Sequence, residues 1–210
     1  MNCKNCSAPL EGDFCSNCGQ KSRTDRINGT YVLQEIPNSV LQVDRGFLYT
    51  IKELFIRPGH SIREYLEGKR INHYKPVAFA LVLCSLYAIS VSLIKENTIM
   101  GMALSGASDG IISAVQKIDD DGKLKNLEKI RILILWTQRN YAYTSLLLLP
   151  FFSLATYISY LGKGFNYFEH LVLNLYIEGQ KMLIYLLFVP FLYYITNDNL
   201  NGHIQLVQFI

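Results

Sequence analysis

The stretch YAYTSLLLLPFFSLATYISYL, residues 141–161, decides the fold because it holds twenty-one consecutive residues without a charged side chain. As an α-helix it would rise about 31 Å, which matches the hydrocarbon thickness of a lipid bilayer. Pro150 lies in the middle of the stretch and is expected to kink this helix. The stretch therefore predicts a helix that spans a membrane.

Two further apolar stretches lie on either side of it. Residues 77–94 carry no charge and predict another span, whereas residues 171–195 predict a third span that is interrupted by Glu178, Gln180 and Lys181. Half of the 210 residues are hydrophobic and only 18% are charged. We therefore expect a mainly α-helical membrane protein with two to three transmembrane helices and room for a fourth short membrane-associated helix.

Ionisable residues just before and within the third span suggest a polar site in the membrane. The candidates are Glu169, His170, Glu178 and Lys181. Charged groups near the bilayer centre usually face a partner, a cavity or a pathway. Glu178 and Lys181 are three residues apart, so they either pair on one helical face or reach the headgroups, or the group lines a conduction or substrate path.

The first 22 residues predict a small metal-binding head. Cys3-x-x-Cys6 and Cys15-x-x-Cys18 present two pairs of thiolates, which is the ligand set that Zn²⁺ prefers in structural sites. Rubredoxin-like iron or two disulfides are the alternatives. Because four thiolates leave zinc no open position, the metal is expected to be structural, and residues 1–22 form a zinc-ribbon-like head followed by a linker over residues 23–38.

Residues 39–75 read as amphipathic helices that precede the membrane. Ser39 with Gln42 and Ser61 with Glu64 form two capping boxes, and Gly68 is placed to end the second helix. Four basic residues are expected to contact anionic headgroups at the membrane interface. They are Arg63, Lys69, Arg70 and Lys75. The membrane region then runs over residues 76–210, with a loop over residues 95–140.

Several of these motifs resemble one bacterial family. They are RPGHSIREYLEGKR at residues 57–70, YKP at 74–76, FCSNCGQ at 14–20 and EHLV at 169–172. Together they resemble the family catalogued as domain of unknown function 3667. The resemblance implies a zinc-ribbon-like head on a membrane-embedded body, and no established activity. Ser7 stands where a glycine often follows the second cysteine, which would strain that turn slightly.

Compartment and function follow from the same features. Basic residues flank both sides of the spans equally, so the orientation is decided by the thiolates, which survive best in a reducing compartment. We expect an inner-membrane protein with a cytoplasmic N-terminus and an external loop over residues 95–140. A net charge of +3 disfavours nucleic acid as a partner.

Two classes of function stay open. The first is a non-enzymatic membrane protein whose zinc head recruits or senses a protein partner, with self-association as another way to cover its helices. The second is a small transporter, channel or membrane enzyme subunit that uses the ionisable residues of the third span. The sequence shows a docking module and no catalytic constellation, so it favours the first class.

Overall fold

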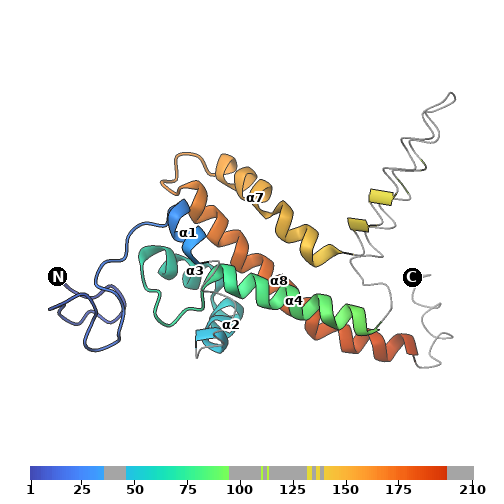
Figure 1. Cartoon of the computed structure of the whole chain (residues 1–210), viewed down its shortest axis with the longest axis horizontal. Helices are drawn as coiled ribbons and strands as arrows, with labels where there is room; N and C mark the ends of the chain where they lie inside the picture. The colour runs from blue at the N-terminus through green and yellow to red at the C-terminus, as the bar shows by residue number, and fades with distance from the viewer. Residues whose placement is uncertain are drawn as a thin grey trace. The chain divides into compact units, whose positions relative to one another are not determined.

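The computed structural model describes residues 1–35, 46–94 and 140–197, with a few positions between 110 and 137. These residues form helices and no strand, as predicted for a mainly α-helical protein. The helices are α1 (Gly29–Glu35), α2 (Gly46–Ile56), α3 (Pro58–Glu67), α4 (Pro76–Ile94), α7 (Tyr141–Ser159) and α8 (Tyr167–Asn197), and Figure 1 shows their order along the chain. The predicted capping box at Ser39 and most of the predicted loop over residues 95–140 lie outside the described residues.

The chain divides into two compact units. Unit 1 comprises Met1–Cys84 and Leu148–Met182, and unit 2 comprises Ser85–Leu147 and Leu183–Ile210. Within unit 2, the ring of Tyr185 lies 6.0 Å from that of Tyr87 and 6.2 Å from that of Tyr141. The cysteine cluster and the residues that attach the head all lie in unit 1.

Two helices are long and apolar enough to cross a membrane. They are α7 and the segment Tyr167–Phe188 of α8, whereas the apolar part of α4 over Pro76–Ser90 is shorter. Only 28% of α7 is buried within the protein, and exposed Leu147, Phe151 and Phe152 lie along it. The core helix of a water-soluble protein is usually mostly buried, so this exposed surface favours a membrane span. The predicted third span, which lies in α8, is thus long and apolar enough to cross a membrane despite its charged residues. The described apolar part of α4, which was predicted as a span over residues 77–94, is too short.

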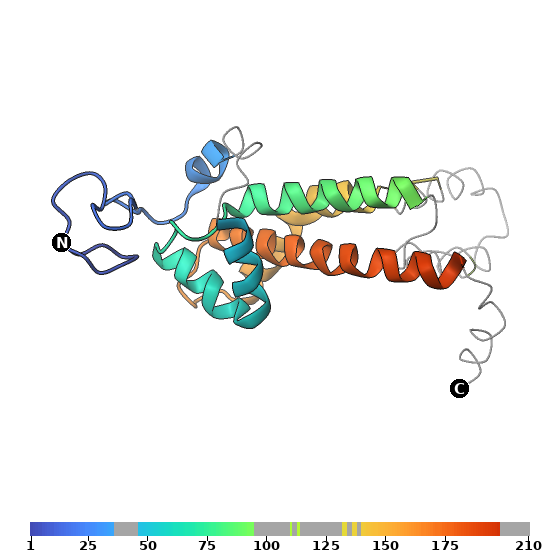
Figure 2. The same ribbon diagram turned by 90° about the horizontal axis from the view of Figure 1, so that it is seen from below.

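The start of α4 packs closely on α8 in unit 1, and Figure 2 shows the two helices running side by side. Gly179 permits this approach, because a Cβ atom at that position would lie 2.5 Å from the ring of Phe79. Small residues let helix backbones approach one another in this way. Tyr176, which is 1% exposed, adds a hydrogen bond from its hydroxyl to the carbonyl of Tyr74 at 2.7 Å.

Helix α3 begins earlier than its predicted capping box. The helix starts at Pro58 and is preceded by Arg57, which makes no side-chain cap. Proline suits this first position because it has no N–H to leave unsatisfied and its φ angle is already helical. Ser61 therefore lies inside the helix, so the predicted cap at Ser61 is wrong, while Gly68 ends the helix with a φ of 110° as predicted.

Candidate metal centre and the surfaces that hold it

Two chain turns with the same hydrogen-bond pattern carry the four cysteines. In the first turn the N–H of Cys3 donates to the carbonyl of Ala8, and in the second the N–H of Cys15 donates to that of Gln20, both at 2.8 Å. Each turn also closes on its first cysteine, through the N–H of Ser7 and of Gly19, both at 2.9 Å. The head is thus a repeat of one ligand turn after twelve residues, which is why both cysteine pairs face one point.

The sulfur atoms lie at distances that suit a single metal ion. All four lie within 4.8 Å of one another, with 3.6 Å between Cys3 and Cys18 and 3.5 Å between Cys6 and Cys15. A tetrahedral ion with metal–sulfur distances of about 2.3 Å would separate its ligands by about 3.8 Å. A disulfide would need a sulfur–sulfur distance of about 2.05 Å. The four cysteines of the cluster and Cys84 are all free thiols. The cluster could therefore hold a metal ion, and the disulfide alternative is not the arrangement adopted.

The four thiols are close enough to shift one another's pKa values. The backbone N–H of Ala8 and the neighbouring sulfurs lower the pKa of Cys6 to about 6. The backbone N–H of Gln20 lowers the pKa of Cys18, but burial and the other three thiols outweigh this effect and raise the pKa to about 11. Thiolates repel one another at this spacing, so the fourth proton is difficult to remove without a cation. A metal ion supplies the positive charge that lets all four sulfurs ionise.

Ser7 adopts the left-handed conformation that favours glycine, which is the residue that often stands here in the family that the sequence resembles. Its φ is 62°, against 75° for Gly19 in the second turn. A side chain in this region costs about 1 kcal/mol relative to glycine. The first ligand turn therefore carries a small strain that the second does not.

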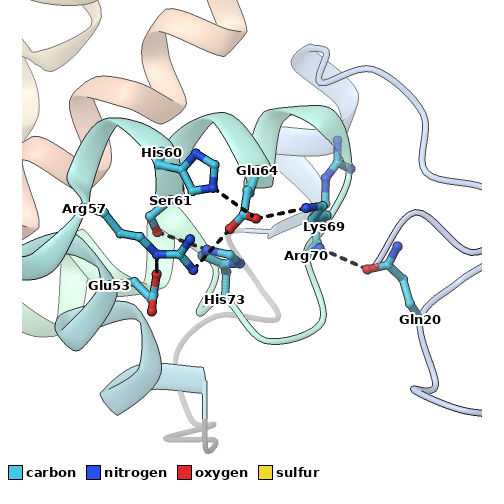
Figure 3. Close-up of polar contacts among 9 residues, drawn as sticks. All are labelled: Gln20, Glu53, Arg57, His60, Ser61, Glu64, Lys69, Arg70 and His73. Carbon is cyan, nitrogen blue, oxygen red and sulfur yellow. Dashed lines mark hydrogen bonds and ion pairs between the residues drawn. The ribbon is translucent and has the colours of Figure 1, made fainter. Parts of the chain in front are cut away.

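Gln20 attaches the head to the end of α3. Its side chain is 4% exposed, and its Nε2 donates to the carbonyl of Gly68 at 2.9 Å. Its Oε1 accepts from the backbone N–H of Arg70 at 3.0 Å, as Figure 3 shows, and of Ile71 at 3.3 Å. One amide side chain, two residues after the last cysteine, thus satisfies three backbone groups beyond the helix.

Arg70 forms the other side of this attachment. Its Nη2 donates to the carbonyl of Asp25 at 2.9 Å, and its guanidinium lies 4.8 Å from the ring centroid of Tyr31 and 5.5 Å from that of Tyr65. A guanidinium over an aromatic face is attracted by the negative potential of the ring. Arg70 is therefore engaged within the protein.

Arg26 connects the segment after the head to the start of α8. Its Nε and Nη2 donate to the two oxygens of Glu169, each at 2.8 Å, and this carboxylate raises the pKa of the arginine. Glu169 also accepts from the N–H of Asn166 at 2.7 Å, while Asn166 Oδ1 accepts from the N–H of Glu169. This reciprocal pair is a capping box at the start of α8.

A row of ion pairs on α2 and α3 is visible in Figure 3. Arg57 pairs with Glu53 one turn earlier, and Lys69 donates to Glu64 at 2.9 Å. The lysine, followed by the neighbouring histidine and arginine, holds the pKa of Glu64 below its usual value. His60 lies 3.5 Å from the same carboxylate. These contacts satisfy each other and keep α3 in place beside α2.

Ser61 and His73 form a pair that resembles a nucleophile and its base. The Ser61 hydroxyl lies 3.0 Å from Nε2 of His73, but the residues are 1% and 8% exposed. Burial, the largest effect, lowers the pKa of His73. Tyr49 and Tyr65 present their ring edges to the imidazole. A substrate could not reach this hydroxyl, so the pair fastens the segment after α3 to the helix.

The four predicted interface residues have different surroundings. Lys69 and Arg70 are engaged by Glu64 and by the tyrosines, whereas Arg63 and Lys75 are exposed. The four residues of the predicted intramembrane group make separate contacts: Glu169 pairs with Arg26 outside the group, whereas Glu178 accepts from Lys181 within it at 2.6 Å. His170 is 5% exposed and lies among Tyr157, Tyr160 and Phe165.

Sequence reasoning missed Gln20 and Arg26, the residues that attach the head. Neither stands in a recognisable spacing, because their partners lie 48 and 143 positions away. The sequence signal that comes nearest is the spacing of Asn166 and Glu169, which is typical of a capping box at the start of a helix. This pattern would have predicted a capping function for Glu169.

The fold and the cysteine cluster together define a helical protein with two helices able to cross a membrane and an N-terminal site able to hold a metal ion. Residues 44–88 match the family model described as Protein of unknown function (DUF3667), which confirms the resemblance predicted from the sequence motifs. The matched segment contains α2, α3 and the start of α4. No curated protein and no solved structure matches the chain.

Proposed function

We propose that this protein is a membrane-anchored docking protein, with a structural zinc ion in its head and a surface on that head that recruits a protein partner. Zinc is favoured over iron because a closed set of four thiolates on two short turns is a usual structural zinc site. We place the N-terminus in the cytoplasm and the helices in the inner membrane of a bacterium. The reducing cytoplasm keeps the thiolates available for the metal.

The observation that carries this proposal is the attachment of the head to the helices by one side while its other side is exposed. Gln20 buries its amide against α3, whereas Phe14, immediately before the second ligand turn, is 59% exposed. Aromatic side chains are frequent anchors in protein interfaces. Because the metal shapes both turns, it would hold Phe14 in place for a partner.

The transport alternative receives less support from the geometry. Glu169 and Glu178 each have a cationic partner, and Glu169 also caps α8. Among the described residues these groups do not form one continuous polar path. We therefore keep recruitment as the proposed function.

The metal is tested first by elemental analysis of the full-length protein purified in detergent. We expect about one zinc per chain in the wild type and none in Cys15→Ser. The matched control is Cys84→Ser, which alters the cysteine outside the cluster and should keep the zinc. Stoichiometric iron in place of zinc would contradict the metal assignment, and an ordered head without metal would contradict its structural role.

Recruitment is tested with a photo-crosslinking amino acid at Phe14, compared with the same group at Leu33, an exposed residue of α1. We expect one discrete adduct at position 14 in intact cells that is absent from the Cys15→Ser background. An adduct of the same size at position 33, or no metal-dependent adduct at position 14, would contradict recruitment through the head. Labelling of position 14 by a membrane-impermeant reagent in intact cells would reverse the proposed orientation.

A further inference from the structure

A cleft with both charge signs lies beside the turn that joins α7 and α8. Its volume is about 470 Å³, and four separate segments of unit 1 line it. These are Lys4 in the head, Thr24 to Arg26 after it, one face of α3, and the residues from Gly164 to Glu169. This turn joins the two candidate spans, so a chain that crosses a membrane through α7 and α8 would hold the turn on the same side as the head. Lipid headgroups of that side are then the membrane groups nearest to the cleft.

Two cations of the cleft retain hydrogen-bonding capacity. The side chain of Arg63 makes no hydrogen bond or ion pair with the residues that the structure describes, and it is exposed on α3. Within the described ranges, the Lys4 ammonium makes one hydrogen bond, to the carbonyl of Thr24 at 3.1 Å. The hydroxyl of Thr24 is buried and has no partner in the described part of the chain. These groups are suited to the oxygen atoms of a phosphate ester.

Two carboxylates balance these cations. Glu169 is already neutralised by Arg26, but Asp25 and Glu67 also line the cleft and are exposed. Neither side chain forms an ion pair with a described residue. A simple phosphate anion would be repelled by them, whereas a ligand that carries an ammonium beside its phosphate would meet both signs.

We propose that this cleft binds the phosphoethanolamine group of a zwitterionic phospholipid. The phosphate lies toward Arg63 and Lys4, and the primary ammonium lies toward Glu67 and Asp25. Phe165 and Leu66 supply apolar surface for the glycerol and upper acyl chains. This binding site goes beyond the proposed recruitment function and does not depend on the identity of any protein partner.

The test measures binding of short-chain phosphatidylethanolamine to the full-length protein in detergent by native mass spectrometry. Phosphatidylcholine and phosphatidylglycerol with the same acyl chains are the comparisons, because the first has a methylated ammonium without N–H donors and the second has no ammonium. We expect phosphatidylethanolamine to bind about tenfold more tightly than either. Equal binding of the three lipids, or tightest binding of phosphatidylglycerol, would overturn the proposal.

Single substitutions separate the two ends of the ligand. Arg63→Gln should weaken phosphatidylethanolamine and phosphatidylcholine alike, by about tenfold, because both carry the phosphate. Glu67→Gln should abolish the preference between those two lipids. Lys52→Gln and Glu11→Gln, which change exposed charges outside the cleft, are the matched controls and should bind like the wild type. A Glu67→Gln variant that keeps the full preference would refute the ammonium assignment.

Two further measurements complete the test. Neither Arg63 nor Glu67 has an ion pair with a described residue, so both variants should unfold at the wild-type temperature. Soluble O-phosphoethanolamine then distinguishes the source of the ligand. If it competes as strongly as the lipid, the ligand is a soluble phosphate ester and the assignment to a phospholipid is overturned. If only the lipid binds tightly, the assignment is supported.

Discussion

Replacing Gln20 by alanine should release the head from α3 while leaving the metal cluster intact. The change removes three hydrogen bonds, to the carbonyl of Gly68 and from the N–H groups of Arg70 and Ile71, at 2.9, 3.0 and 3.3 Å. A hydrogen bond of this kind contributes about 1 kcal/mol net. The longest of the three bonds is weaker, and water can reach the exposed Ile71 after the change. The free energy that holds the head on α3 should therefore fall by about 2 kcal/mol. The population of the released head should therefore rise about 30-fold.

Amide hydrogen exchange of the segment after α3 tests whether these hydrogen bonds hold the head. In the wild type the N–H groups of Arg70 and Ile71 are bonded to Gln20, so their exchange requires these bonds to open. Because both amides lose their acceptor in Gln20→Ala, we expect them to exchange at least about 30-fold faster. The N–H of Gly19, which donates within the second ligand turn, should keep its protection because the metal still holds that turn.

The matched control is Lys21→Ala, which changes the exposed neighbour of Gln20 and should exchange like the wild type. Zinc content is measured on the same samples to show that both variants keep the metal. If Arg70 and Ile71 exchange within threefold of the wild type in a zinc-replete Gln20→Ala protein, Gln20 does not attach the head and the reasoning fails.

Three more predictions concern the ligand turn, the ion pairs and the helix packing. Ser7→Gly should raise the zinc affinity measured by chelator competition about fivefold, because it removes about 1 kcal/mol of backbone strain at a positive φ angle. Gly19→Ala should lower the affinity by a similar factor. A loss of affinity in Ser7→Gly would show that the first turn is unstrained. Lys69 is the main cause of the lowered pKa of Glu64 in the folded state, so the ionised carboxylate stabilises the fold above the ordinary pKa of 4.5, and this stabilisation is lost as the pH falls below that value. The melting temperature should therefore fall with pH in the wild type and fall less in Glu64→Gln. Identical pH profiles of the two proteins would contradict this contribution of Glu64. Gly179→Ala places a methyl group against Phe79 and should destabilise the protein by about 1–3 kcal/mol, whereas Gly59→Ala, with open space around the new Cβ, should not; equal melting temperatures would show that α4 and α8 do not pack at Gly179.

Local features of the fold were predictable because their causes are local. The spacing of the cysteines brings four sulfurs within 4.8 Å, and Gly68 ends α3 because only the absence of a side chain makes its φ of 110° inexpensive. Where two local signals compete, the outcome is harder to predict. Ser61 with Glu64 resembles a cap, but Pro58 suits the first helical turn and Ser61 finds a partner in His73.

The attachment of the head could not be predicted for a different physical reason. Glu169 stands at the start of an apolar stretch, and from the sequence alone an ionisable residue there indicates a function in the membrane. Its partner Arg26 is 143 positions away, and no periodicity relates two segments that meet only after the chain has folded. Because Gln20 and Arg26 both lie within eight residues of Cys18, ordering of the cysteine turns by a metal would place both side chains at once. Loss of the metal would therefore loosen both contacts with the helices, so the cluster stabilises the position of the head as well as its fold.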